Sequence, residues 1–197
     1  MTMKPSPPHA ANDGRPLIIR MGKRLRGTIN RLSTAQSIIP TEPVLHPDFF
    51  DWTERLANNW QTIAGEAAAI LRHRDAVPPL RDISPDHARI AGDGNWRSFF
   101  LIGYGYEVPE NCARAPETAA LVRDIPDLNS AFFSILEPGA TIPRHRGVTR
   151  GLVTCHLGLI VPDQAQQCVM QVEDSHLSWE AGKWLVFDDS YYHEVHN

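Results

Sequence analysis

Short alternating segments dominate the chain from residue 96 onward and restrict the fold more than any other feature of the sequence. Six segments are typical of β-strands: "WRSFFLIGYGY" (96–106), "NSAFFSIL" (129–136), "LVTCHLGLIV" (152–161), "CVMQVED" (168–174), "HLSWE" (176–180) and "KWLVFDD" (183–189). Turn sequences such as "EPGATIP", "PDQAQQ" and "EAG" separate several of them. Many short strands with turns between them favour an antiparallel sandwich or barrel.

Helices are predicted ahead of these strands. Residues 51–73 carry apolar side chains at helical spacing and begin with Asp51 and Glu54 at the spacing of a capping box. Residues 116–125 predict a short helix, and the Pro-, Gly- and Asp-rich residues 74–97 predict a loop with irregular, substrate-facing structure. The expected class is α+β, with a mainly β, jelly-roll-like core in a domain spanning 46–197.

Residues 1–45 form a basic N-terminal segment. Seven basic residues and one acidic residue fall within residues 1–41, whereas the whole chain has a net charge of −4. Apolar and basic residues alternate at helical spacing over 15–32, which predicts a short amphipathic helix. Two interpretations are open: this helix contacts an anionic membrane surface, or it is a solvated helix packed on the domain.

The cellular setting is expected to be the cytoplasm, or the inner face of its membrane. No apolar run approaches the roughly 20 residues of a membrane span, and the N-terminus lacks the apolar centre of a secretion signal. The three cysteines form no CxxC motif, which fits a reducing compartment. We expect no nucleic-acid partner.

Two histidines lie where strands of a jelly roll would end. His145 follows a Pro-Gly turn at the start of one strand, and His193 follows a strand and its turn. Paired imidazoles suit Fe(II), Zn or Cu. The common iron triad has a carboxylate two residues after the first histidine, where this chain has Gly147. Asp188 and Asp189 are the nearest alternative carboxylates, and on a strand only one of them faces inward.

The segments "IPDLNSAFFSILEPGATIPRHRG", "TCHLGLIVP" and "SWEAGKWLVFDDSYYHEV" resemble the aspartyl/asparaginyl β-hydroxylases, a family of Fe(II)- and 2-oxoglutarate-dependent oxygenases. The resemblance covers about Trp96 to Asn197 and implies a double-stranded β-helix. It implies that His145 and His193 hold the iron, because animal members also have glycine at the position of Gly147. It also implies 2-oxoglutarate as cosubstrate and O2 as oxidant. His156 matches a residue contacting the C1 carboxylate of 2-oxoglutarate, and Ser134 matches a serine near the C5 carboxylate.

The chain departs from the family pattern at two places. Thr154 stands where animal members have an arginine; Arg150 or Arg146 is a candidate replacement, and a solvent-facing role for either is the alternative. The family also places a further strand with an arginine that contacts 2-oxoglutarate after the second iron ligand. The domain at 46–197 is therefore expected to lack its C-terminal strand.

The expected function is hydroxylation of an unactivated C–H bond in an acyl chain, a peptide Asp or Asn, or a related small molecule. Two alternatives stay open. Gly147 leaves room for a halide on the iron, which would make the protein a halogenase. In the second alternative, the chain is a degenerate jelly-roll binding module without turnover. His176 and His196 match no family position.

Overall fold

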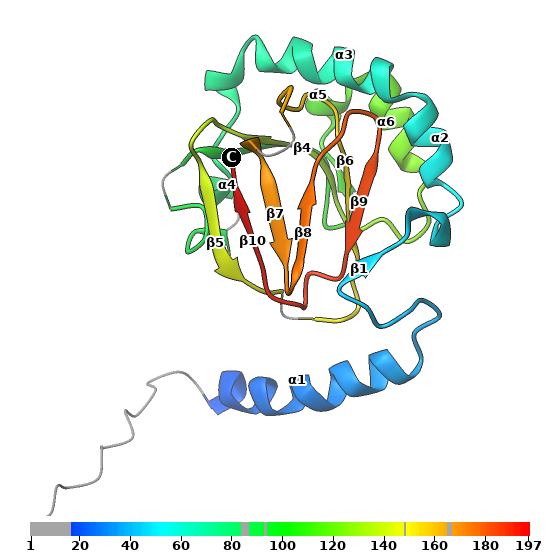
Figure 1. Cartoon of the computed structure of the whole chain (residues 1–197), viewed down its shortest axis with the longest axis vertical. Helices are drawn as coiled ribbons and strands as arrows, with labels where there is room; N and C mark the ends of the chain where they lie inside the picture. Colours follow the sequence, from blue (N-terminus) through cyan, green and yellow to red (C-terminus); the bar gives the residue numbers. More distant parts are fainter. Residues whose placement is uncertain (1–16, 84–86, 93, 148, 165–166) are drawn as a thin grey trace, which may run out of the picture.

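The computed structural model describes residues 17–83, 87–92, 94–147, 149–164 and 167–197. Helices form one layer at the top of Figure 1, and short antiparallel strands lie below and in front of them. The first helix, α1 (Leu17–Ala35), lies outside the helical layer, below the lower end of this body in Figure 1. Among the described helices, none is both long enough and apolar enough to cross a bilayer.

The helical layer covers one face of a small sheet. Helices α2 (Thr53–Asn58), α3 (Trp60–Leu71), α5 (Pro109–Cys112) and α6 (Pro116–Arg123) pack against strands β2 (Trp96–Gly103) and β4 (Ala131–Leu136). The buried cluster between them includes Ile63, Ile70, Leu101, Val122 and Phe133. The Glu66 carboxylate binds the first turn of α6 by accepting bonds from the backbone N–H groups of Glu117 and Thr118 at 3.0 and 2.9 Å.

The predicted helix at 51–73 is broken in two. Asn59 separates α2 from α3, and Trp52 stands at the N-cap of α2 without a side-chain capping bond, so the predicted capping box is wrong. The start of α2 is fixed by a tertiary contact instead. The rings of Trp52 and Trp184 pack edge to face at 5.3 Å, and the Trp184 indole N–H donates to the Thr53 carbonyl at 2.9 Å.

Three antiparallel sheets make up the β part of the structure, in the strand orders β1-β9-β6, β5-β10-β7-β8 and β3-β2-β4. The remaining strands are β1 (Val44–Leu45), β3 (Tyr106–Glu107), β5 (Thr141–His145), β6 (Thr154–Leu157), β7 (Val169–Val172), β8 (Ser175–Ser178), β9 (Trp184–Phe187) and β10 (His193–His196). The predicted α+β class with antiparallel strands is therefore confirmed. Closure into a jelly roll stays a prediction.

Segments between these elements include short helical turns. The residues predicted as loop from 74 to 97 hold η2 (Arg74–Ala76) and α4 (Leu80–Ile83), and η1 (Pro47–Phe49) precedes α2. Strand β5 begins inside the segment predicted as a turn, with Pro143 in the strand. Proline is tolerated there because β5 is an edge strand, which pairs on one side only.

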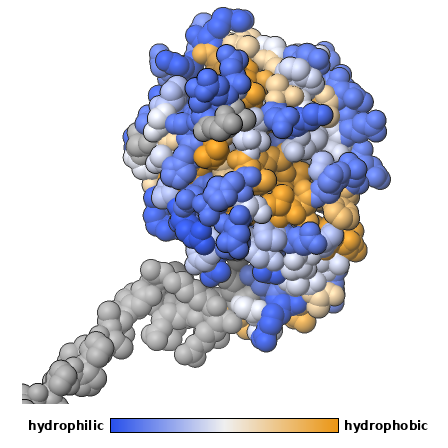
Figure 2. Space-filling model, viewed as in Figure 1, coloured by the Kyte–Doolittle hydropathy of each residue, from blue (hydrophilic) through white to orange (hydrophobic). Residues whose placement is uncertain are grey.

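A second buried cluster lies under the sheet that carries β5 and β10. It contains Ile142, Met170, Val172, Phe187 and Val195, and Trp96 and Leu136 pack against it. In the view of Figure 2, hydrophilic residues surround an apolar area near the middle of the face. The buried cluster supports β5 and β10, the strands on which the candidate ligands lie.

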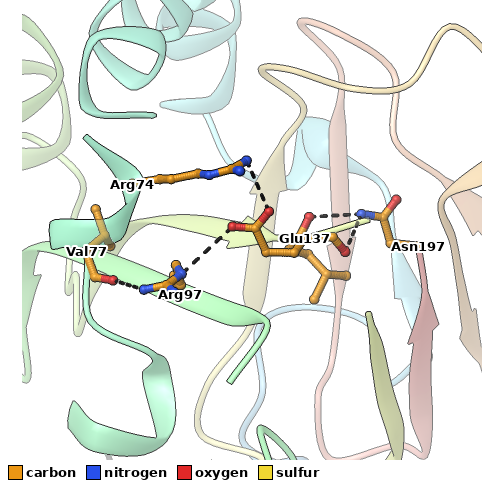
Figure 3. Close-up of polar contacts among 6 residues, drawn as sticks. Arg74, Val77, Arg97, Glu137 and Asn197 are labelled. Carbon is orange, nitrogen blue, oxygen red and sulfur yellow. Dashed lines mark hydrogen bonds and ion pairs between the residues drawn. The ribbon is translucent and has the colours of Figure 1, made fainter. Parts of the chain in front are cut away.

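At the end of β10 farthest from His193, polar contacts connect three parts of the fold (Figure 3). The Glu137 carboxylate lies 3.4 Å from Arg74 and 3.8 Å from Arg97, and Arg97 donates to the Val77 carbonyl at 2.7 Å. The Asn197 side-chain amide donates to the Glu137 carbonyl at 3.1 Å. These bonds fix β10 against the turn that leads into β5.

Strands β4 and β6 each end their sheet, and neither pairs with another strand on its outer edge among the residues described. Such edges leave backbone N–H and C=O groups available to a strand from elsewhere. The further strand expected from the family resemblance stays a prediction.

Candidate functional site

His145 and His193, 48 positions apart in the sequence, lie side by side in the structure. His145 ends β5 and His193 begins β10, and the two residues are directly paired in the antiparallel register. Paired residues of antiparallel strands point to the same face. Their ring centroids are 4.1 Å apart. We call this end of the sheets, where β5 and β9 finish and β10 begins, the histidine end.

Backbone carbonyls orient both rings in the same way. The Nδ1 atom of His145 lies 2.8 Å from the Pro143 carbonyl, and the Nδ1 atom of His193 lies 3.0 Å from the Tyr191 carbonyl. A carbonyl only accepts, so each Nδ1 carries the hydrogen and each Nε2 keeps its lone pair. Histidine ligands of metals are commonly held by such a bond from the other ring nitrogen. Both rings are therefore prepared to bind a cation through Nε2.

Burial keeps the pair neutral. It lowers the pKa of His145 to about 4, helped by the neighbouring His193, and it also lowers the pKa of His193. Neutral imidazole is the form that binds metal. The charges of His87 and Arg89 lower the His145 pKa further, which places both residues near the site. Sequence reasoning missed these two residues, because they fall in a segment without periodicity.

Asp189 fills the space beside Gly147. A Cβ atom at position 147 would lie 2.5 Å from Asp189 Oδ1, and the Gly147 N–H donates to the Asp189 carbonyl at 2.7 Å. Burial, and secondarily the charge of Asp188, raises the pKa of Asp189 to about 6. Its Oδ1 atom is buried and has no hydrogen-bond partner in the part of the chain described. A carboxylate thus occupies the place where the side chain of residue 147 would begin.

The structure also separates the two aspartates that the sequence left as alternatives. The Asp188 carboxylate accepts a bond from the backbone N–H of Ser190 at 2.8 Å and lines a small pocket together with Arg150. Asp188 therefore stabilises the turn, while Asp189 faces Gly147. The inward-facing carboxylate predicted from strand geometry is Asp189.

His156 lies close to this pair, on β6. Its ring is stacked on Trp179 at 5.9 Å and meets the edge of Phe187 at 5.4 Å, and Phe187 in turn contacts His193 at 5.1 Å. Burial and the nearby His193 lower the pKa of His156 to about 4. Its ring nitrogens have no hydrogen-bond partner among the described residues. A neutral imidazole in this position has one N–H to donate to an acceptor.

The other two predicted cosubstrate residues lie apart from each other. Ser134, on β4, accepts a bond from the Trp96 indole N–H at 2.9 Å, and the Trp96 ring contacts His87 at 6.0 Å. Arg150 instead lies over the Tyr191 ring at 4.9 Å, on the side of α1. No hydrogen bond, ion pair or ring contact within the described ranges joins Arg150 to His156 or Ser134.

No group of three or more His, Cys, Asp or Glu side chains in metal-binding arrangement occurs among the residues described. The candidate metal centre therefore consists of two imidazoles, and the Asp189 carboxylate lies against Gly147, two residues after His145. The assignment of His145 and His193 as metal ligands stays a prediction, and the described residues supply no third His, Cys, Asp or Glu ligand beside them.

Residues 57–197 match the sequence profile of the family described as aspartyl/asparaginyl beta-hydroxylase. This chain belongs to the aspartyl/asparaginyl β-hydroxylase family. Among similar proteins is the ornithine lipid ester-linked acyl 2-hydroxylase of Rhizobium tropici, 38% identical over 155 residues, which cover 79% of this chain and 55% of that protein. The human aspartyl/asparaginyl beta-hydroxylase is 30% identical over 152 residues, covering 75% of this chain and 19% of that protein.

A third β-hydroxylase relative is the aspartate beta-hydroxylase domain-containing protein 2 of Xenopus tropicalis. It is 34% identical over 148 residues, covering 71% of this chain and 38% of the frog protein. The chain thus spans about half of the bacterial relative and smaller parts of the two animal relatives.

Proposed function

We propose that this chain is a hydroxylase dependent on Fe(II) and 2-oxoglutarate, with His145 and His193 as its iron ligands. The observation that carries the proposal is the pair of neutral imidazoles whose Nδ1 atoms are both held by carbonyls, leaving both Nε2 atoms free. Imidazole nitrogen suits Fe(II). When bound, the iron, 2-oxoglutarate and O2 supply the oxidation of an unactivated C–H bond, and the jelly-roll fold is part of the proposal.

The residues around the pair fit a dianionic cosubstrate. His156 has an N–H without a partner in the described structure and lies one aromatic ring away from His193. Ser134 supplies a hydroxyl whose oxygen already accepts from Trp96, so its own hydrogen is available for a carboxylate. The rings of Trp179 and Phe187 contact the His156 ring and fix its position.

Asp189 favours hydroxylation over halogenation at this site. The halogenase alternative needs an open space beside Gly147 for an anion, but the Asp189 carboxylate already fills that space. A second anion there would meet like charge in a buried setting, which is costly. A bound cation would instead favour the ionised carboxylate. The Asp189 carboxylate therefore fits a site that binds a cation, and it does not fit a site that also binds a halide beside Gly147.

For the substrate, we propose a lipid acyl chain. The bacterial relative, which is more similar in sequence than the human one, is named for hydroxylation of an ester-linked acyl chain. The human relative's name supports a peptide Asp or Asn as the other candidate. Incubation with each substrate class under O2, followed by mass spectrometry for a gain of one oxygen, separates the two.

Metal binding and turnover test the proposed ligands directly. His145→Ala and His193→Ala are expected to abolish both anaerobic Fe(II) binding, measured by calorimetry, and succinate release from 2-oxoglutarate. His196→Ala is the matched control, because His196 lies on the same strand as His193 but is exposed and contacts Glu194 instead. His176→Ala, on β8, is a second control. Full Fe(II) binding by His145→Ala would refute the ligand assignment.

Cosubstrate binding is tested at His156. His156→Ala is expected to raise the KM for 2-oxoglutarate about tenfold or more, because a carboxylate of 2-oxoglutarate loses the imidazole N–H that donates to it. If 2-oxoglutarate bound to the wild-type protein without any succinate release under all conditions, the degenerate binding module would be the better description.

A further inference from the structure

Helix α1 is attached to the histidine end of the body. Figure 1 shows it running below the point where β5 and β9 finish and β10 begins. The Asn30 side-chain oxygen accepts from the backbone N–H of Arg150 at 3.4 Å. Thr34 and Ser37, at the end of α1 and just beyond it, line a small pocket with Leu152 and other residues of the same connection. The helix therefore lies next to the loop that follows His145.

Three large apolar side chains in the described part of α1 are exposed. Leu25, Ile29 and Leu32 follow one another at spacings of four and three residues, so they share one face of the helix. They are 54%, 56% and 60% exposed, although large apolar side chains of this kind are usually buried. Leu152, in the adjoining loop, is also exposed. The contacts of α1 with the body leave this face open.

The sequence of the same segment is rich in positive charge. Residues 15–31 contain six basic residues and no acidic one. At the histidine end, Arg146 lies over the Tyr192 ring at 4.9 Å and Arg150 lies over the Tyr191 ring at 4.9 Å. Neither guanidinium has a carboxylate partner in the described part of the chain. These two cations are held in place by aromatic rings while their charges stay available to an external anion.

We propose that α1 and the loops of the histidine end form one surface that docks on an anionic lipid bilayer. Apolar side chains flanked by Lys and Arg are the composition of helices that lie in the headgroup region. The bilayer is the occupant that matches both features, because it supplies anionic headgroups and an apolar layer at once. Docking in this way brings the histidine end to the membrane, which is where an acyl substrate lies.

Docking on a bilayer is a property separate from the proposed hydroxylation, and it does not require turnover. It rests on that proposal only in taking the bilayer as the source of the substrate. Vesicle binding is therefore measured with the full chain, without added metal or 2-oxoglutarate. Binding without succinate release would refute the proposed function alone, and succinate release without binding would refute the docking surface alone.

The test is co-sedimentation with vesicles of phosphatidylcholine alone or mixed in equal parts with phosphatidylglycerol. We expect binding to the mixed vesicles only, weakened by salt because exposed charges are screened. Ile29→Asn should weaken binding about tenfold through lost apolar burial. Ile160→Asn is the matched control, since Ile160 is 57% exposed but lies beyond the opposite end of β6. Equal losses from the two substitutions would overturn the proposal.

Charge is tested in the same assay. Arg146→Gln should weaken binding to the mixed vesicles about fivefold, the effect of one cation near an anionic surface. Arg72→Gln is the control, because Arg72 is exposed at the far end of α3. Analytical ultracentrifugation without lipid tests a second copy of the chain as the occupant. A dimer that Ile29→Asn dissociates, or equal binding to neutral and anionic vesicles, would overturn the proposal.

Discussion

Replacing Asp189 by asparagine should stabilise the metal-free protein at neutral pH. Burial raises the pKa of Asp189 from its ordinary value of 3.8 to about 6. The folded protein therefore binds this proton more tightly than the unfolded chain, and it loses stability as the pH rises from about 4 to 6. A shift of about two pKa units corresponds to roughly 3 kcal/mol, which is an upper limit for the cost of the ionised carboxylate.

Asparagine keeps the shape of the side chain but removes this charge. We expect Asp189→Asn to raise the free energy of unfolding by about 1–3 kcal/mol at pH 8 and to change it little at pH 3.5. The assay is urea denaturation of chelator-treated protein, followed by tryptophan fluorescence across this pH range. A variant no more stable than the wild type at pH 8, or one equally stabilised at both pH values, would refute the reasoning.

The same pair of proteins reports on the metal centre. Anaerobic Fe(II) should stabilise the wild type more than Asp189→Asn, because a bound cation favours the ionised carboxylate beside Gly147. Equal stabilisation of the two proteins would show that the carboxylate does not act on the metal.

Three further substitutions test contacts at the site, in the sheet beside it and in the helical layer. Gly147→Ala should displace the Asp189 carboxylate, cost about 1–3 kcal/mol of stability and weaken Fe(II) binding measured by calorimetry. Gly158→Ala places a Cβ against a backbone carbonyl oxygen of the β8–β9 connection, so thermal denaturation should show a loss of about 3 kcal/mol or more. Glu66→Ala leaves the Thr118 N–H and hydroxyl at the start of α6 without their acceptor, and urea denaturation should show a loss of about 1.5–3 kcal/mol.

Local periodicity accounts for much of the fold. Alternation over two residues predicts β2, β4, β7 and β9 within a few residues, and helical spacing predicts the helix at α1. The short helix predicted at 116–125 corresponds to α6. The strands and α6 are readable because each of them buries one face, and the spacing of apolar residues records which face that is. In α1 the same spacing marks an apolar face that is exposed. Residues 51–73 are the counterexample, because contacts with Trp184 rather than the local spacing fix where α2 begins.

The sequence by itself determined that His145 and His193 lie at strand ends, and family similarity marked them as a pair. Only the tertiary structure decided that they face each other, because the register between β5 and β10 joins residues 48 positions apart. It also decided that Asp189 rather than Asp188 fills the space at Gly147, and that α1 lies at the histidine end. Spacing along a chain records which face of an element is buried, but the neighbour that covers that face is set by long-range packing.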